Sequence, residues 1–423
     1  MTRGTRIVEL LLLIYPLAIL ATGSILLTLV RGDEVSSAVG RSVAAFGLIV
    51  LAIHAALSLR LARADQELLP IVAGLAALGL VAVQRLEPGL ADRQLLWVGL
   101  GAVALIGTAL FLPGIEWLAR YRYTWLAGGL VVLAVTIAFG IDPNGSGTRL
   151  WLGYGGLYYQ PSEIMKVVTA VFLASYLAEK RTLMTRPFMF GRIPLPPLPY
   201  LGPLLAVWAL AMVLLIWQRD LGAALLFYGV FLAVLYLSTG RPYLGVGLVF
   251  LAMGGFVAYQ LFDHVQLRTR IWLDPWPYAS GDAYQIVQAL NAYAAGGVFG
   301  VGLGQGYPEY VPAVHTDFVL AALGEEMGLL GTIAIVGLYL TLVHRAFTIA
   351  LRARSDFAML LAAGLGATMG IQAIIILAGN LRLMPITGIT LPFLSYGGSS
   401  IVANCVMVGV LLRISAESRA RSE

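Results

Sequence analysis

About twelve apolar runs of around 20 residues divide this sequence, and they constrain its fold more than any single motif does. A run of that length crosses the hydrocarbon core of a bilayer as one helix. The chain is 59% hydrophobic and 12% charged, with a mean hydropathy of +0.86, whereas soluble domains carry about twice that charge fraction. The sequence therefore predicts an all-α, polytopic membrane protein with about 12 transmembrane helices. The runs lie near residues 8–30, 42–62, 69–86, 94–113, 123–141, 162–179, 200–217, 221–239, 243–262, 322–347, 357–379 and 396–413.

Basic residues fall in alternate loops between these runs, among them Arg60, Arg120, Arg181 and Arg345. The positive-inside rule makes this side cytoplasmic and places both termini there. The first run, which starts near Val8, has no convincing small-residue cleavage site, so we interpret it as a spanning helix. Because the basic residues lie in these loops, the net charge of +5 does not indicate a nucleic-acid partner.

Three loops on the opposite, external side are unusual. Residues 142–159 are rich in glycine and aromatics. Residues 263–318 form a segment longer than ordinary connections, and such segments are usually functional or disordered. Its tryptophans, tyrosines and glycines favour an ordered loop at the membrane surface. Residues 380–395 contain Pro385, Gly388 and Pro392, which predict a re-entrant turn.

One charged pair lies at the start of an apolar run. Glu163 and Lys166 are three residues apart, so they share one face of a helix and can pair. Ionisable groups near hydrocarbon are costly and usually face a polar cavity, which makes this pair a candidate functional site. The alternative is an ion pair that only locks two helices together.

Further polar side chains recur at the external ends of the runs. A pocket of mixed cations and carboxylates suits a substrate with an anionic pyrophosphate and a long apolar tail. The cations would hold the phosphates, and a carboxylate could take a proton from a hydroxyl nucleophile. A role as a hydrogen-bonded helix cap explains His315 as well as a catalytic role does. A solvated first helical turn likewise explains Glu325 and Glu326 as well as a catalytic role does. The polar set comprises Arg149, Glu163, Lys166, Gln218, Arg219, Asp220, His315, Thr316, Asp317, Glu325, Glu326, Asn380 and Arg382.

Several motifs occur in the order found in the SEDS family, the shape, elongation, division and sporulation proteins RodA and FtsW, which this chain resembles from about Leu69 to Arg413. The motifs are Gly147-Thr148-Arg149-Leu150-Trp151-Leu152, Gln160-Pro161-Ser162-Glu163-Ile164-Met165-Lys166, Gln218-Arg219-Asp220-Leu221-Gly222, Tyr284-Gln285, His315-Thr316-Asp317-Phe318, Gly324-Glu325-Glu326-Met327-Gly328, Pro385-Ile386-Thr387-Gly388 and Leu391-Pro392-Phe393-Leu394-Ser395-Tyr396-Gly397-Gly398.

This resemblance implies a peptidoglycan glycosyltransferase that polymerises lipid II at the outer face of the bacterial cytoplasmic membrane, beside a class B penicillin-binding protein. Family members typically have about ten spans. Residues 1–66 are therefore expected to be two additional N-terminal transmembrane helices, and residues 67–423 the SEDS-like core. Glu163 and Lys166 match the family's intramembrane pair, and Asp220 matches a motif aspartate. Substrate contacts are expected from Arg149, Gln160, Ser162, Gln218, Arg219, Tyr284, Gln285, His315 and Asp317.

The chain departs from the family at the external-loop aspartate presumed to be catalytic, since Tyr278 occupies the matching position. A phenol is a poor base at neutral pH because its ordinary pKa is about 10. We expect Asp282 to act as the base instead, with Asp274 as the other nearby carboxylate. Arg219 replaces the family's usual proline and adds a cation next to Asp220.

Two other functions fit the sequence. A family member without transferase chemistry would bind the lipid-linked precursor or a penicillin-binding protein as a scaffold. A transporter of lipid-linked precursors would explain the intramembrane charges, although the hydropathy shows no inverted repeat. No cofactor is certain; the carboxylates could hold a divalent cation, but no ligand spacing specifies one. Elongation, division and sporulation roles are not separated by the sequence.

Overall fold

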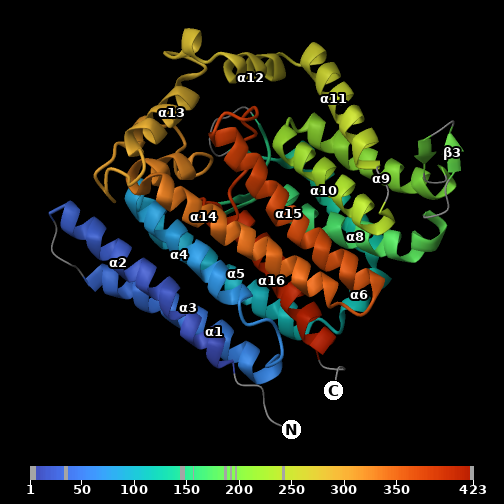
Figure 1. Cartoon of the computed structure of the whole chain (residues 1–423), viewed down its shortest axis with the longest axis horizontal. Helices are drawn as coiled ribbons and strands as arrows, with labels where there is room; N and C mark the ends of the chain where they lie inside the picture. The colour runs from blue at the N-terminus through green and yellow to red at the C-terminus, as the bar shows by residue number, and fades with distance from the viewer. Residues whose placement is uncertain are drawn as a thin grey trace.

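The computed structural model describes residues 6–32, 37–142, 148–155, 157–184, 188–190, 193–195, 198–240 and 243–419. Within these residues, 12 helices are long and apolar enough to cross a membrane, which confirms the predicted all-α, polytopic fold (Figure 1). Gly147, the first residue of one family motif, and the basic loop around Arg186 and Arg192 lie outside the described residues.

The helices follow the predicted apolar runs closely. The long external segment, expected as an ordered loop, contains two helices, and the external segment before α8 contains a short hairpin. The helices are α1 (Ile7–Leu12), α2 (Ile14–Val30), α3 (Ser37–Arg60), α4 (Leu68–Leu86), α5 (Ala91–Phe111), α6 (Ile115–Arg120), α7 (Arg122–Phe139), α8 (Pro161–Met184), α9 (Leu198–Trp217), α10 (Leu221–Thr239), α11 (Tyr243–Leu261), α12 (Asp263–Leu273), α13 (Tyr284–Gly296), α14 (Val319–Leu351), α15 (Asp356–Asn380) and α16 (Gly398–Arg419). Short 3₁₀ turns are η1 (Pro88–Leu90), η2 (Trp276–Tyr278) and η3 (Pro308–Tyr310), and the strands pair as hairpins β1 (Leu152–Tyr154) with β2 (Leu157–Tyr159) and β3 (Phe188–Phe190) with β4 (Ile193–Leu195).

Helices α4, α8, α15 and α16 form the buried centre of the bundle, whereas α11 stands at its edge (Figure 1). Only 6% of the spanning window of α11 is buried inside the protein, against 78% for α8 and α15. Small residues allow the central helices to approach closely. A Cβ at Gly79 would lie 2.6 Å from the carbonyl oxygen of Phe393, so glycine lets α4 touch the segment between α15 and α16.

That segment, residues 381–397, forms no regular helix or strand, and its second half is buried. The Tyr339 hydroxyl of α14 donates to the carbonyl of Pro392 at 2.6 Å. Irregular backbone is tolerated at membrane depth when protein surrounds it, as it does here. The contacts agree with the re-entrant turn expected from the prolines and glycine.

Helix α14 is interrupted at Gly328, whose φ of +70° lies in the left-handed region that favours glycine. Beyond this kink, the Leu329 and Leu330 amides donate to the carbonyls of Gly297 and Val298, at 3.0 and 3.2 Å. In the other direction, the amide of Val301 donates to the Glu325 carbonyl at 3.0 Å. The glycine-rich loop after α13 therefore supplies the partners that the broken helix lacks.

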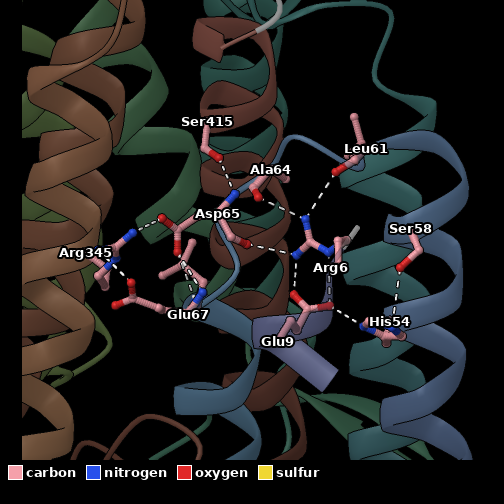
Figure 2. Close-up of polar contacts among 11 residues, drawn as sticks. Arg6, Glu9, His54, Ser58, Leu61, Ala64, Asp65, Glu67, Arg345 and Ser415 are labelled. Atoms are coloured by element: carbon pink, nitrogen blue, oxygen red, sulfur yellow. Dashed lines mark hydrogen bonds and ion pairs between the residues drawn. The ribbon is translucent and has the colours of Figure 1, made fainter. Parts of the chain in front are cut away.

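The N-terminal helices pack against the rest of the bundle, α2 on α4 and α3 on α5 (Figure 1). Figure 2 shows a buried polar network at the end of the bundle where α1 lies. The Arg6 guanidinium pairs with Glu9 and donates to the carbonyls of Ala64 and Asp65, both at 2.9 Å. The Asp65 carboxylate in turn pairs with Arg345 of α14. Whether residues 1–66 form a separate unit stays a prediction.

We expect Arg6→Ala to lower the free energy of unfolding by about 3–5 kcal/mol, because it leaves the Glu9 carboxylate buried with one fewer partner. The measurement is unfolding of the purified protein in mixed micelles titrated with sodium dodecyl sulfate. Arg41→Ala, which removes an exposed arginine from α3, is the matched control. Equal stability of the two variants would show that the network does not hold the N-terminal helices.

Candidate functional site

The charged pair of α8 is buried in the bundle. The Lys166 ammonium lies 2.5 Å from the Glu163 carboxylate and donates to the side-chain oxygen of Gln372 of α15 at 2.8 Å. The Gln372 amide donates to the Thr390 carbonyl at 2.6 Å. The two residues pair, as the i, i+3 spacing predicted, and they face protein, connecting α8, α15 and the re-entrant segment. Lys166 is already occupied by two partners in this structure.

Asp220 lies beside this pair at the first turn of α10. Its carboxylate caps the helix by accepting from the Ala223 amide at 3.0 Å, and it accepts from Ser162 at 3.2 Å and Gln160 at 3.4 Å. Burial raises its pKa, with a smaller contribution from the nearby charge of Glu163. The structure thus brings Gln160, Ser162, Glu163 and Lys166 close to Asp220. Asp220 itself caps α10 and binds it to the start of α8.

Arg268 of α12 is the functional candidate that sequence reasoning missed. Its guanidinium donates to the Ile386 carbonyl at 3.1 Å, and the residue is half-buried. Burial lowers its pKa, while the carboxylates of Asp317 and Asp220 act in the opposite direction. The charges of Asp317, which precedes α14, and of Asp220, which caps α10, therefore both act on Arg268. Arg268 and Arg270 lie on the same short helix, and no local sequence feature predicts that Arg268 is half-buried while Arg270 is exposed.

An apolar groove of about 790 Å³ leads to this arginine from between α9, α10 and α11. Its walls are mostly aliphatic and aromatic, including Trp208 and Phe250, and residues 384–387 also line it. Among the described residues that line it, Arg268 carries the charge. Because α11 stands at the edge of the bundle, the groove borders the surface that faces lipid. Such a shape suits a long apolar tail with an anionic head.

Asp317 precedes α14 and faces the same arginine. The Asn380 side chain of α15 donates to the Asp317 carbonyl at 2.8 Å and fixes this turn. Its carboxylate is half-buried, and burial raises its pKa to about 6, against the opposing effects of Thr316 and Arg268. Asp317 was predicted only to contact substrate.

The other predicted residues are dispersed around this centre. Gln218 donates to the Leu133 carbonyl at 2.8 Å and so ties α9 to α7. Arg149 and Arg219 are exposed at the external surface, and Arg219 has a left-handed φ of +60°. The His315 ring packs edge-on against Tyr396, with centroids 5.9 Å apart.

Glu325 and Glu326 are buried, so the solvated first turn considered for them is wrong. Glu326 pairs with Arg85 at 2.7 Å and accepts from the Gly304 amide at 2.9 Å, while Glu325 accepts from the Tyr307 amide at 3.0 Å. These carboxylates hold the glycine-rich loop against α4 and are occupied by that task.

The predicted base lies in the turn between α12 and α13. Asp282, Asp274 and Tyr278 are all exposed there. The following helix is anchored elsewhere, because Gln285 donates to the Pro312 carbonyl at 2.7 Å and Tyr284 begins α13. Asp282 as the base stays a prediction. Across the described residues, no group of three or more histidine, cysteine or acidic side chains is arranged to hold a metal, and a divalent cation also stays a prediction.

Comparison with known proteins places these features in a family. The model of a family of cell cycle proteins, FtsW, RodA and SpoVE, matches residues 66–420. The peptidoglycan glycosyltransferase RodA of Mycobacterium tuberculosis (strain ATCC 25618 / H37Rv) is 40% identical over 97% of this chain and 90% of that protein. A probable peptidoglycan glycosyltransferase FtsW of Coxiella burnetii is 34% identical over 81% of this chain and 94% of that protein.

Solved structures agree. Thermus thermophilus RodA, a rod shape determining protein, has a TM-score of 0.59 and 27% identity, covering 84% of this chain and 98% of that chain. A chain from a structure that describes the coordination of polymerization and crosslinking by a peptidoglycan synthase complex has a TM-score of 0.71 and 29% identity, covering 84% and 99%.

Removing one partner of the buried ion pair tests how it is stabilised. Lys166→Met leaves the Glu163 carboxylate uncompensated, so we expect a loss of about 3–5 kcal/mol in the free energy of unfolding. The double variant Glu163→Gln/Lys166→Met removes both charges and should recover most of that loss. Denaturant unfolding in mixed micelles measures both. A double variant as unstable as the single one would mean that packing, rather than the pair, is lost.

Proposed function

The chain belongs to the FtsW, RodA and SpoVE family of cell cycle proteins and is a multi-pass membrane peptidoglycan glycosyltransferase of cell wall synthesis; we propose that it polymerises lipid II at the outer face of the cytoplasmic membrane. One observation carries the proposal: an apolar groove that borders the lipid-facing surface is lined by a half-buried arginine, Arg268, which is the charged residue among the described residues of its lining.

The groove and Arg268 match the two halves of such a substrate. Aliphatic and aromatic walls solvate a polyprenyl tail, and the guanidinium can hold a pyrophosphate through paired hydrogen bonds. In an apolar surrounding, that contact is stronger than it would be in water. The substrate then binds with its tail in the groove and its sugars toward the external turn of α12 and α13.

The reaction joins two such lipids. The 4-hydroxyl of the acceptor disaccharide attacks the anomeric carbon of the donor, and undecaprenyl pyrophosphate leaves. Negative charge grows on the leaving phosphates, and Arg268 is placed to stabilise it. The Glu163–Lys166 pair and the Asp220 cap keep α8, α10 and α15 in register around this point.

The orientation of the chain supports an external reaction. Helix α1 and the C-terminal end of α16 lie at one end of the bundle, and α12 and α13 lie at the other (Figure 1). Arg345 belongs to the first end, as do the loops predicted to be basic, and the positive-inside rule supports the proposal that both termini are cytoplasmic. A class B penicillin-binding protein is the proposed partner, in keeping with the synthase complex that contains a structural relative.

Replacing Arg268 tests the phosphate site. We expect Arg268→Ala to lower the rate of lipid II polymerisation by about 10²–10³-fold, because a preorganised contact to the developing charge is lost. The assay uses purified protein, fluorescent lipid II and a class B penicillin-binding protein, with glycan strands resolved by gel. Arg270→Ala removes an exposed arginine two residues away and is the matched control. Equal rates for the two variants would exclude Arg268 from the reaction.

Filling the groove tests the tail site. Gly254 of α11 lines the groove, and a Cβ there would meet no atom within 4 Å, so Gly254→Leu fits without a clash. Its side chain takes space that the tail would occupy, and we expect KM for lipid II to rise about tenfold with kcat nearly unchanged. Gly245→Leu, on the same helix but outside the groove, also meets open space and is the control. An unchanged KM in Gly254→Leu would contradict the tail site.

A further inference from the structure

We propose that Asp317 is the general base of this enzyme, the carboxylate that takes the proton from the acceptor hydroxyl. The inference rests on the proposed function and adds a named residue to it. It differs from the expectation that a carboxylate of the turn between α12 and α13 does this work.

The position of Asp317 is the first support. It lies beside Gly388 of the re-entrant segment, where an added Cβ would have the Asp317 carboxylate oxygen as its one neighbour within 4 Å, at 3.7 Å. Gly388 is exposed and has a left-handed φ of +72°, so a residue with no side chain is favoured there. The carboxylate therefore lies beside an exposed glycine that directly follows residues 384–387, which line the groove.

The second support is the electrostatic link between Asp317 and the proposed phosphate site. Arg268 lines the groove, and its charge acts on Asp317. We infer that a donor whose pyrophosphate is held by Arg268 presents its anomeric carbon, which is bonded to a phosphate oxygen, toward this carboxylate. In the step, the acceptor oxygen bonds to the anomeric carbon while the bond from that carbon to the phosphate oxygen breaks. The hydroxyl proton goes to Asp317, and the electron pair leaves with the pyrophosphate.

The third support is that neighbouring carboxylates have other tasks. Asp220 accepts three hydrogen bonds, and Glu163 is paired with Lys166. Glu325 and Glu326 hold the glycine-rich loop. Asp282 and Asp274 lie in an exposed turn. Of these carboxylates, Asp317 combines partial burial, the attraction of the Arg268 charge and a position beside the exposed Gly388.

The charged groups around Asp317 fit a base that works near neutral pH. The charge of Arg268 of α12 acts on Asp317, and that arginine also feels the charge of Asp220. Arg382, which follows α15, donates instead to the Trp272 and Leu273 carbonyls. His315 is turned toward Tyr396 and Glu87. Burial holds the Asp317 pKa at about 6, so the carboxylate is ionised and able to accept a proton above that pH.

The test is the pH profile of lipid II polymerisation by the full chain with a class B penicillin-binding protein. In the wild-type enzyme, kcat/KM should be level above pH of about 6 and fall about tenfold per pH unit below it, since protonation removes the base. Asp317→Asn should lower the rate by about 10²–10⁴-fold and remove this acidic limb. Asp317→Glu should keep the fall in kcat/KM at acidic pH, with a lower kcat/KM than the wild type at neutral pH. Asp263→Asn, on the exposed start of α12, is the control and should match the wild type.

Folding is checked separately. Desolvation of an ionised Asp317 costs stability at neutral pH, so Asp317→Asn should keep or raise the midpoint of thermal unfolding at pH 8 and still bind lipid II in nanodiscs. A raised folded-state pKa means that this carboxyl contributes less stability as pH rises from about 4 to about 6. A lower midpoint together with an unchanged acidic limb in Asp317→Asn would assign Asp317 a purely structural role.

Two further outcomes overturn the inference. If Asp282→Asn loses activity and the acidic limb while Asp317→Asn keeps both, the base is the loop carboxylate and the proposed polymerase stands. If the wild-type chain forms no glycan with any class B partner, the polymerase proposal fails and the base assignment fails with it.

Discussion

The bundle depends on the requirement that every charge buried in it has a partner. Lys166 can lie among apolar helices because Glu163 and Gln372 surround its ammonium, and those contacts reach α15 and the re-entrant segment. Asp220 joins the same assembly from α10 through Ser162. A few polar atoms thus fix the relative positions of the central helices, whose apolar surfaces alone would allow them to slide.

This rigid centre positions a site at its outer edge. Arg268 comes from a short helix outside the membrane, yet its guanidinium is anchored to the carbonyl of Ile386, in the segment that follows α15. The arginine is therefore connected to the ion-pair cluster through the same re-entrant segment that Gln372 contacts. One continuous set of contacts therefore holds both Arg268 and the ion-pair cluster, and under the proposed function it would restrict the positions that a bound pyrophosphate can take.

Hydropathy predicted the spanning helices well, because each run must cross the bilayer as one unit. The face shared by Glu163 and Lys166 followed from their spacing alone. The position of Arg268 against Ile386 could not be predicted from sequence spacing, because it depends on where the distant re-entrant segment meets α12. The break of α14 at Gly328, and the hydrogen bonds that join Gly297 and Val298 to the helix beyond it, were not predicted from the sequence either. Motif order recovered the family, whereas it could not tell exposed Asp282 from half-buried Asp317.

The position of α11 at the edge of the bundle has a consequence for the turnover of the enzyme. A groove that borders the lipid-facing surface lets a polyprenyl carrier enter and depart sideways, without its tail ever meeting water. Exchange of substrate and spent carrier then proceeds by two-dimensional diffusion in the leaflet rather than by extraction from it. The rate of turnover would then depend on the fluidity and thickness of the surrounding bilayer, because the substrate reaches the groove through the membrane.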